Sequence, residues 1–148
     1  MVIQYLATGD YDVAIRFGQE ALAIARSLGD RAIEVVATSF LGMTYLDRGE
    51  FDDPATLLER NVALEGDLRY ERFGAPAIQS ALSGAHLADV HSQLGRFDEA
   101  VGYGDAAMRI AEEADHPFTL FWGSFRLGLA PLPSRGPPAR DPDPRAMP

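Results

Sequence analysis

The 148-residue chain contains no cysteine, and its 13 basic side chains are all arginine. Without cysteine it can form no disulfide, no thiolate nucleophile and no thiolate zinc site, and without lysine it can form no Schiff base. No hydrophobic run approaches the ~20 residues of a membrane-spanning helix, and no basic segment followed by an apolar one opens the chain. Acidic side chains are in excess, and the formal charge of −9 argues against nucleic-acid binding. We therefore expect a soluble, cytoplasmic protein that binds neither nucleic acid nor membranes.

What the chain does have is hydrophobic residues, 47% of the total, and an internal repeat. Three stretches share a glycine, one polar residue, an aromatic residue and an aspartate. We expect each unit to form a helix, a tight turn and a second helix. The glycine would end the first helix with a positive φ, and the aspartate would be the N-cap of the second. The glycines are Gly9, Gly49 and Gly95, the aromatic residues are Tyr11, Phe51 and Phe97, and the aspartates are Asp12, Asp52 and Asp98.

The hydrophobic spacing predicts helices at about 12–28, 32–48, 53–65, 76–94, 98–114 and 117–130, after residues 1–8, which we expect to end an earlier helix. Gly102 and Gly104 fall inside one of these helices, where we expect them to permit close packing of a neighbour. Phe118, Trp122 and Phe125 recur at a spacing of three to four residues and require a packing partner. Without one, we expect self-association through this aromatic stripe.

The repeat resembles the tetratricopeptide repeat family over residues 1–130. The resemblance implies an all-α fold, an antiparallel helix-hairpin solenoid of about three to four partial repeats. The sequence departs from the family pattern at His91, where tyrosine is expected, and at Pro54, where alanine is expected. It also lacks the tryptophan found early in each first helix. The matching residues are Leu41, Gly42, Tyr45, Gly49 and Phe51 in the second unit and Leu87, Ala88, Gly95, Phe97, Ala100 and Ala107 in the third.

The composition changes abruptly after residue 130, since seven of the ten prolines lie in residues 131–148. No helix can run through them, so one interpretation is a disordered Pro/Arg-rich tail. The other is a frameshifted or truncated gene. A one-nucleotide shift of degenerate codons can give His-Cys-Arg-Arg-Gly-Asp-Leu-Pro-Arg-Ala-Thr-Arg-Thr-Leu-Glu-Arg. That reading restores the glycine and aspartate of the repeat at the distance from Gly128 that the repeat requires.

The sequence contains no pattern typical of a catalytic, cofactor-binding or metal-binding site. Paired carboxylates at 52–53, 98–99 and 112–113 occupy adjacent helical positions, which diverge by about 100° and cannot enclose a substrate. His86 and Asp89 share a helix with His91, but the two histidines are too far apart for the spacing of three or four that a metal pair needs. We expect His91 to be a half-buried core residue and His116 to be a turn residue.

The resemblance to the family also implies a concave groove lined by the first helix of each unit. Apolar at one end and acidic at the other, this groove suits an amphipathic or basic peptide segment, and docking onto the rest of a larger protein is the equal alternative. Some family members bind a peptide's terminal carboxylate through Lys, Asn and Arg, which this chain lacks at the matching positions. The implied groove residues are Val36, Ser39, Phe40, Met43, Asp47, Leu82, Ala85, His86, Asp89 and Gln93.

Residues 9–30 resemble the repeat arms of bacterial signalling proteins, in which the arm follows an ATPase and often an adenylate or guanylate cyclase domain. The similarity lies in Gly-Asp-Tyr-Asp-x-Ala-Ile and in Ala-Arg-Ser-Leu-Gly-Asp-Arg-Ala. It implies a non-catalytic interaction and regulatory module, with any ATPase or cyclase activity outside this chain. A free-standing adaptor is the alternative, and a hydrolase that uses His86 and Asp89 in an acidic groove is a remote one.

Overall fold

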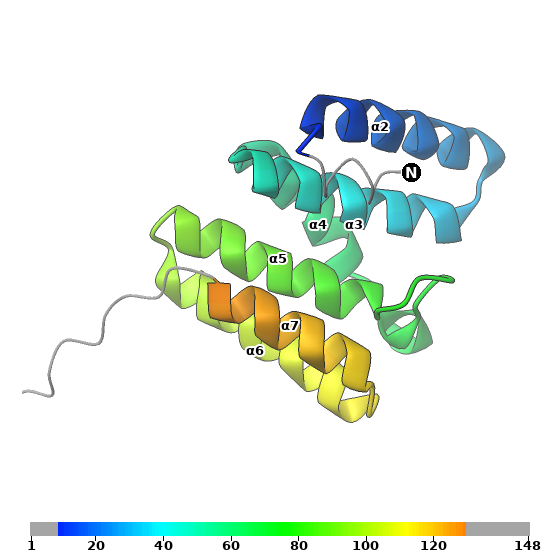
Figure 1. Cartoon of the computed structure of the whole chain (residues 1–148). Coiled ribbons are helices and arrows are strands. Elements are labelled where there is room, and N and C mark those ends of the chain that lie inside the picture. The colour runs from blue at the N-terminus through cyan, green and yellow to red at the C-terminus, as the bar shows by residue number, and fades with distance from the viewer. Residues whose placement is uncertain (1–8, 130–148) are drawn as a thin grey trace, which may run out of the picture.

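The computed structural model describes residues 9–129, and all regular structure in this range is helical (Figure 1). The predicted all-α fold is thus confirmed, with helix ends within about three residues of those expected. The expected helix end at residues 1–8 and the segment 131–148 lie outside the described residues. The elements are α2 (Tyr11–Leu28), α3 (Arg31–Arg48), α4 (Asp52–Val62), the 3₁₀ helix η1 (Gly66–Tyr70), α5 (Gln79–Gln93), α6 (Phe97–Glu113) and α7 (Pro117–Leu129).

The helices stack in two layers, and each helix packs against the one that follows it (Figure 1). α3, α5 and α7 form the inner layer, in which α5 contacts both of the others. In the outer layer, α4 packs against α3 and α5, and α6 packs against α5 and α7. No single amphipathic helix can bury its apolar face alone, so the stack derives its stability from these neighbour contacts.

Glycine ends the first helix of the second and third repeats as predicted, but the aspartates do not cap the second helix. Gly49 and Gly95 have φ values of 85° and 73°. α2 and α6 begin at Tyr11 and Phe97, so Asp12 and Asp98 lie inside the first turn. There their negative charge interacts favourably with the positive end of the helix dipole. α4 begins at Asp52 itself, and its N-cap position is Phe51. The helices begin at or next to the aromatic residue, one or two residues earlier than predicted.

Small residues allow the helices to approach closely. A Cβ atom on Gly42 would lie 2.5 Å from Cδ2 of Leu58, and one on Gly104 would lie 3.0 Å from Cδ2 of Leu127. The packing role predicted for Gly104 is therefore confirmed. The same role predicted for Gly102 is wrong, because no heavy atom lies within 4 Å of its Cβ position. Gly102 faces solvent on α6, away from the neighbouring helices.

A hydrogen bond connects the start of α7 to the start of α5. Thr119, which is 2% exposed, accepts a hydrogen bond from the backbone N–H of Ile78 at 3.0 Å. Its hydroxyl lies 2.7 Å from Nδ1 of His116, and its backbone N–H also donates to that nitrogen at 3.3 Å. His116 is therefore the turn residue that the sequence predicts, and its imidazole caps α7.

Candidate functional site

The inner helices converge at an ion-pair cluster that shows which of their faces lie together. Arg126 of α7 donates to Asp47 of α3 at 2.7 Å, and its Nε lies 3.8 Å from a carboxylate oxygen of Asp89 on α5. The arginine side chain is only 14% exposed. A cation from α7 therefore already offsets part of the negative charge at the acidic end of the predicted groove, and the sequence did not reveal this contact.

Helical geometry places the other predicted groove residues beside these carboxylates. At about 100° per residue, Val36, Phe40 and Met43 lie within about 40° of Asp47 around α3. Leu82 and Gln93 lie within about 40° of Asp89 around α5 by the same arithmetic. Asp47 and Gln93 are exposed, whereas the four apolar side chains are half-buried. The structure thus brings together on one inner face the following residues: Val36, Phe40, Met43, Asp47, Leu82 and Gln93.

Four of the ten predicted groove residues lie below this surface, so the sequence-based expectation that they line it has to be corrected. Ala85 is fully buried, and His86 and Asp89 are 2% and 5% exposed. Ser39 is 2% exposed because it packs between helices, with its Oγ 3.0 Å from Oγ of Ser83. Each of these side chains is covered by a neighbouring helix and cannot contact a partner directly.

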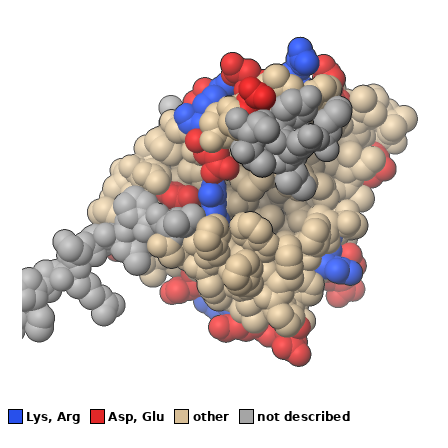
Figure 2. Space-filling view, viewed as in Figure 1, with Lys and Arg blue, Asp and Glu red and all other residues tan. Residues whose placement is uncertain are grey.

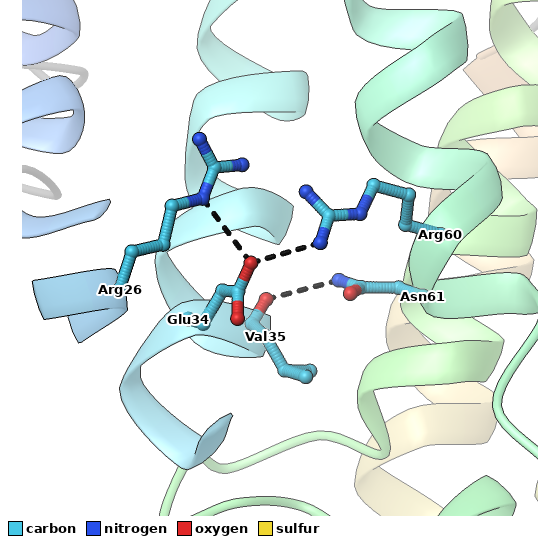
Figure 3. Close-up of polar contacts among 5 residues, drawn as sticks. All are labelled: Arg26, Glu34, Val35, Arg60 and Asn61. Carbon is cyan, nitrogen blue, oxygen red and sulfur yellow. Dashed lines mark hydrogen bonds and ion pairs between the residues drawn. The ribbon is translucent and has the colours of Figure 1, made fainter. Parts of the chain in front are cut away.

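Asn61 joins three helices beneath the inner face. Its amide group donates to the backbone carbonyl of Val35 at 2.9 Å (Figure 3). The same amide nitrogen donates to Oγ of Ser39 at 2.9 Å and to Oγ of Ser83 at 3.2 Å. Nearby, Glu34 of α3 accepts from Arg26 of α2 at 3.2 Å and from Arg60 of α4 at 2.9 Å (Figure 3). These polar contacts fix the relative positions of α2, α3, α4 and α5, on which the shape of the inner face depends.

His86 and Asp89 lack the access that acid–base catalysis requires. Burial, together with the positive charge of Arg126, lowers the pKa of His86 to about 3, so the imidazole is neutral at physiological pH. Its Nδ1 is buried and has no hydrogen-bond partner. Burial raises the pKa of Asp89, while Arg126 and Gln93 act in the opposite direction. Within residues 9–129, no group of three or more acidic or histidine side chains is arranged to hold a metal ion.

His91 occupies the interior position that the sequence predicts. It is 8% exposed and stacks on Tyr103 of α6, with 5.1 Å between the ring centroids and 18° between the ring planes. Neither ring nitrogen has a hydrogen-bond partner. The histidine therefore has a packing role between α5 and α6, in the position where the family has a tyrosine.

The aromatic stripe of α7 is exposed and adjoins the inner face. We call its members, Phe118, Phe121, Trp122 and Phe125, the α7 aromatic ridge. Around α7, Trp122 lies about 40° from Arg126, and Phe121 lies about 140° away. The exposed fraction of the side chain rises with this angular distance from Arg126, from 39% for Trp122 to 62% for Phe121. Figure 2 shows uncharged side chains over α7 in the lower part of the view and a hollow above them.

An apolar hollow of about 400 Å³ continues the inner face at α3. Val36 and Phe40 line it together with Ile33, which is 47% exposed. Its far wall is the turn 73–76 before α5, in which Phe73 and Gly74 have positive φ values. This hollow was not evident from the sequence, because it depends on how the α4–α5 connection folds back.

Two stretches of the chain, residues 81–114 and residues 3–32, match models of the tetratricopeptide repeat. No curated protein and no solved structure matches the chain. The described helices thus form an all-α helical repeat solenoid. Tetratricopeptide repeats, which these two stretches resemble, generally mediate protein–protein interaction and are generally non-catalytic. No helix in residues 9–129 is long and apolar enough to cross a membrane.

Proposed function

We propose that the inner face of α3, α5 and α7 binds a segment of another protein or of another part of the same polypeptide. The observation that carries the proposal is a face with few charges, built from the helices of successive repeats. The residues available for contact are Val36, Phe40, Met43 and Leu82, with Asp47 and Gln93 at one end. The buried positions Ser39, Ala85, His86 and Asp89 support this face from beneath.

The proposed site can be tested with peptides selected from a random library on the full chain. Each selected peptide would be titrated by calorimetry against the wild type, Met43→Ser and Ile24→Ser. Ile24 lies on α2 and is 57% exposed, so it supplies the matched control. We expect Met43→Ser to weaken binding about tenfold and Ile24→Ser to leave it unchanged. Equal affinities for all three proteins would refute binding at the inner face.

We further propose that residues 1–130 belong to the regulatory arm of a bacterial, cytoplasmic signalling protein of the ATPase or cyclase type. The amino-acid sequence of residues 9–30 supports this assignment. If it is correct, residues 131–148 derive from a frameshift. Sequencing the gene with long flanks tests both points. We expect the shifted frame to continue the repeats and an ATPase or cyclase domain to lie upstream. Without these domains, and with residues 131–148 read in frame, a free-standing adaptor would be the better assignment.

Weak self-association is the third proposal for this chain, because Phe118, Trp122 and Phe125 are 39–47% exposed. Sedimentation velocity at increasing concentration would detect it. We expect a concentration-dependent dimer of the wild type that Phe125→Ser abolishes and Ile24→Ser retains. A monomer at every concentration would exclude this role of the α7 aromatic ridge.

A further inference from the structure

We infer that the segment bound at the inner face is an amphipathic helix with basic residues beside its apolar stripe. This inference rests on the proposed function and specifies the chemistry of the partner. The apolar stripe would lie over α5, between the α7 aromatic ridge and the half-buried side chains of α3. Three observations support it, namely the position of the two walls, the shortage of hydrogen-bonding groups on them, and the charge around them.

The two walls stand opposite each other across α5. α7 runs parallel to α5, since Thr119 contacts Ile78 near one end and Arg126 contacts Asp89 near the other. Trp122 lies between these contacts and one turn from Arg126, so it adjoins the middle of α5. The contact between Ser39 and Ser83 brings Phe40 of α3 to the same level. A ligand over Leu82 would therefore contact Phe40 on one side and Trp122 on the other.

The chemistry of the walls favours a ligand whose backbone is already hydrogen-bonded. Val36, Phe40 and Met43 of α3, the ridge and Leu82 are apolar, and the described residues contain no sheet edge to which a strand could add. An extended peptide would bury unpaired backbone N–H and C=O groups against this surface, at a cost in free energy. A helix satisfies those groups internally and can present an apolar stripe.

The charge around the ridge favours basic residues on the partner. Glu112 and Asp115 are exposed directly before α7, and Glu113 lies between them on the same helix end, although Arg72 is close by. Arg126, the charged residue of α7, is already paired with Asp47. The formal charge of the whole chain is −9, so a second copy would bring the same repulsive charge to the contact. A basic amphipathic helix is attracted by this field and touches both walls, whereas a second copy would meet mainly the ridge.

Trp122 is the only tryptophan in the chain, so its fluorescence reports directly on the site. The probe would be a synthetic Leu/Lys peptide of about four helical turns, with leucine at i, i+3, i+4 and i+7. Controls would be a peptide of the same composition with leucine at every second position, and the helical peptide with glutamate in place of lysine. We expect a saturable blue shift of the Trp122 emission with the helical Leu/Lys peptide, and binding at least about tenfold weaker for either control.

Variants separate contact with the ridge from general binding to an acidic protein. Phe118→Ser changes an exposed ridge residue next to Trp122, and Ile24→Ser changes an exposed residue of α2. We expect the first to weaken binding about tenfold and the second to have no effect. The inference would be overturned if both variants bound the helical peptide equally, or if the helical Leu/Lys peptide and its control with leucine at every second position bound equally. A shift of the Trp122 emission caused only by self-association would overturn it as well. Library-selected peptides that bind at Met43 without helical periodicity would overturn it too, but would leave the proposed function intact.

Discussion

At the scale of single residues, Asn61 shows how a buried polar group determines the arrangement of helices. It is 2% exposed, and its hydrogen bonds reach α3 and α5 from α4. The sequence pattern did not single it out, because an asparagine in an amphipathic helix is usually solvated. Its role depends on the fold bringing the hydroxyl groups of Ser39 and Ser83 together, although these residues lie 44 positions apart in sequence.

Replacing Asn61 with alanine should destabilise the fold by about 1–3 kcal/mol, because buried acceptors lose their donor and a small cavity remains. Urea unfolding followed by circular dichroism would measure this difference. Glu20→Ala, a change at an exposed position of α2, is the control and should lie within about 0.5 kcal/mol of the wild type. An Asn61→Ala variant as stable as this control would show that the hydrogen bonds contribute no net stability.

His86 should make the protein less stable as the pH falls below about 6.5. Its folded-state pKa of about 3 lies below the ordinary histidine pKa of 6.5, so the unfolded chain binds the proton first. Stability should therefore fall on acidification by up to about 1.4 kcal/mol per pH unit between these two values. Asp89 acts in the opposite direction, because its raised pKa gives the folded state the greater proton affinity at acidic pH.

The pH effect can be assigned by comparing wild type and His86→Gln in urea at about pH 7.5 and about pH 5.5. The difference in unfolding free energy between the two pH values should be clearly smaller for the variant. If both proteins lose the same stability on acidification, the loss comes from other groups and not from His86.

At the scale of helices, the glycines reveal which faces are packed. The sequence alone could not distinguish Gly104 from Gly102, because both lie within α6 and only the position of α7 separates them. The repeat pattern likewise predicted the helix order and most boundaries, but placed the N-caps one or two residues late. Helix periodicity is a local signal, whereas a cap depends on where the chain leaves the preceding turn.

Two substitutions to alanine should therefore have opposite effects. Gly42→Ala would place a Cβ atom 2.5 Å from the fully buried Leu58, and we expect it to destabilise the protein by about 1–3 kcal/mol. Gly102→Ala meets no atom within 4 Å on an exposed helix face, and should stabilise it by about 0.5–1 kcal/mol. Thermal unfolding of both variants would show the two signs. A shift in the same direction for both would contradict the assignment of packed and open faces.

At the scale of the whole molecule, the sequence predicted the stack and the general location of the inner face, but not which side chains reach its surface. Six of the ten predicted residues remain accessible, and four are covered by neighbouring helices. The difference arises because Ser39 packs against α4 and α5, while α7 lies directly against α5 and inserts Arg126 between Asp47 and Asp89. No pattern within one repeat contains that information, since the contact joins residues 79 positions apart.

The most direct test of the account is an amide NMR map of the full chain, recorded alone and with a library-selected peptide. We expect the largest shifts on the inner face, around Phe40, Leu82 and Trp122, while the exposed surfaces of α2 and α6 change little. Shifts that cluster instead around Ile24 and Val101, which are exposed on those outer helices, would contradict binding at the inner face.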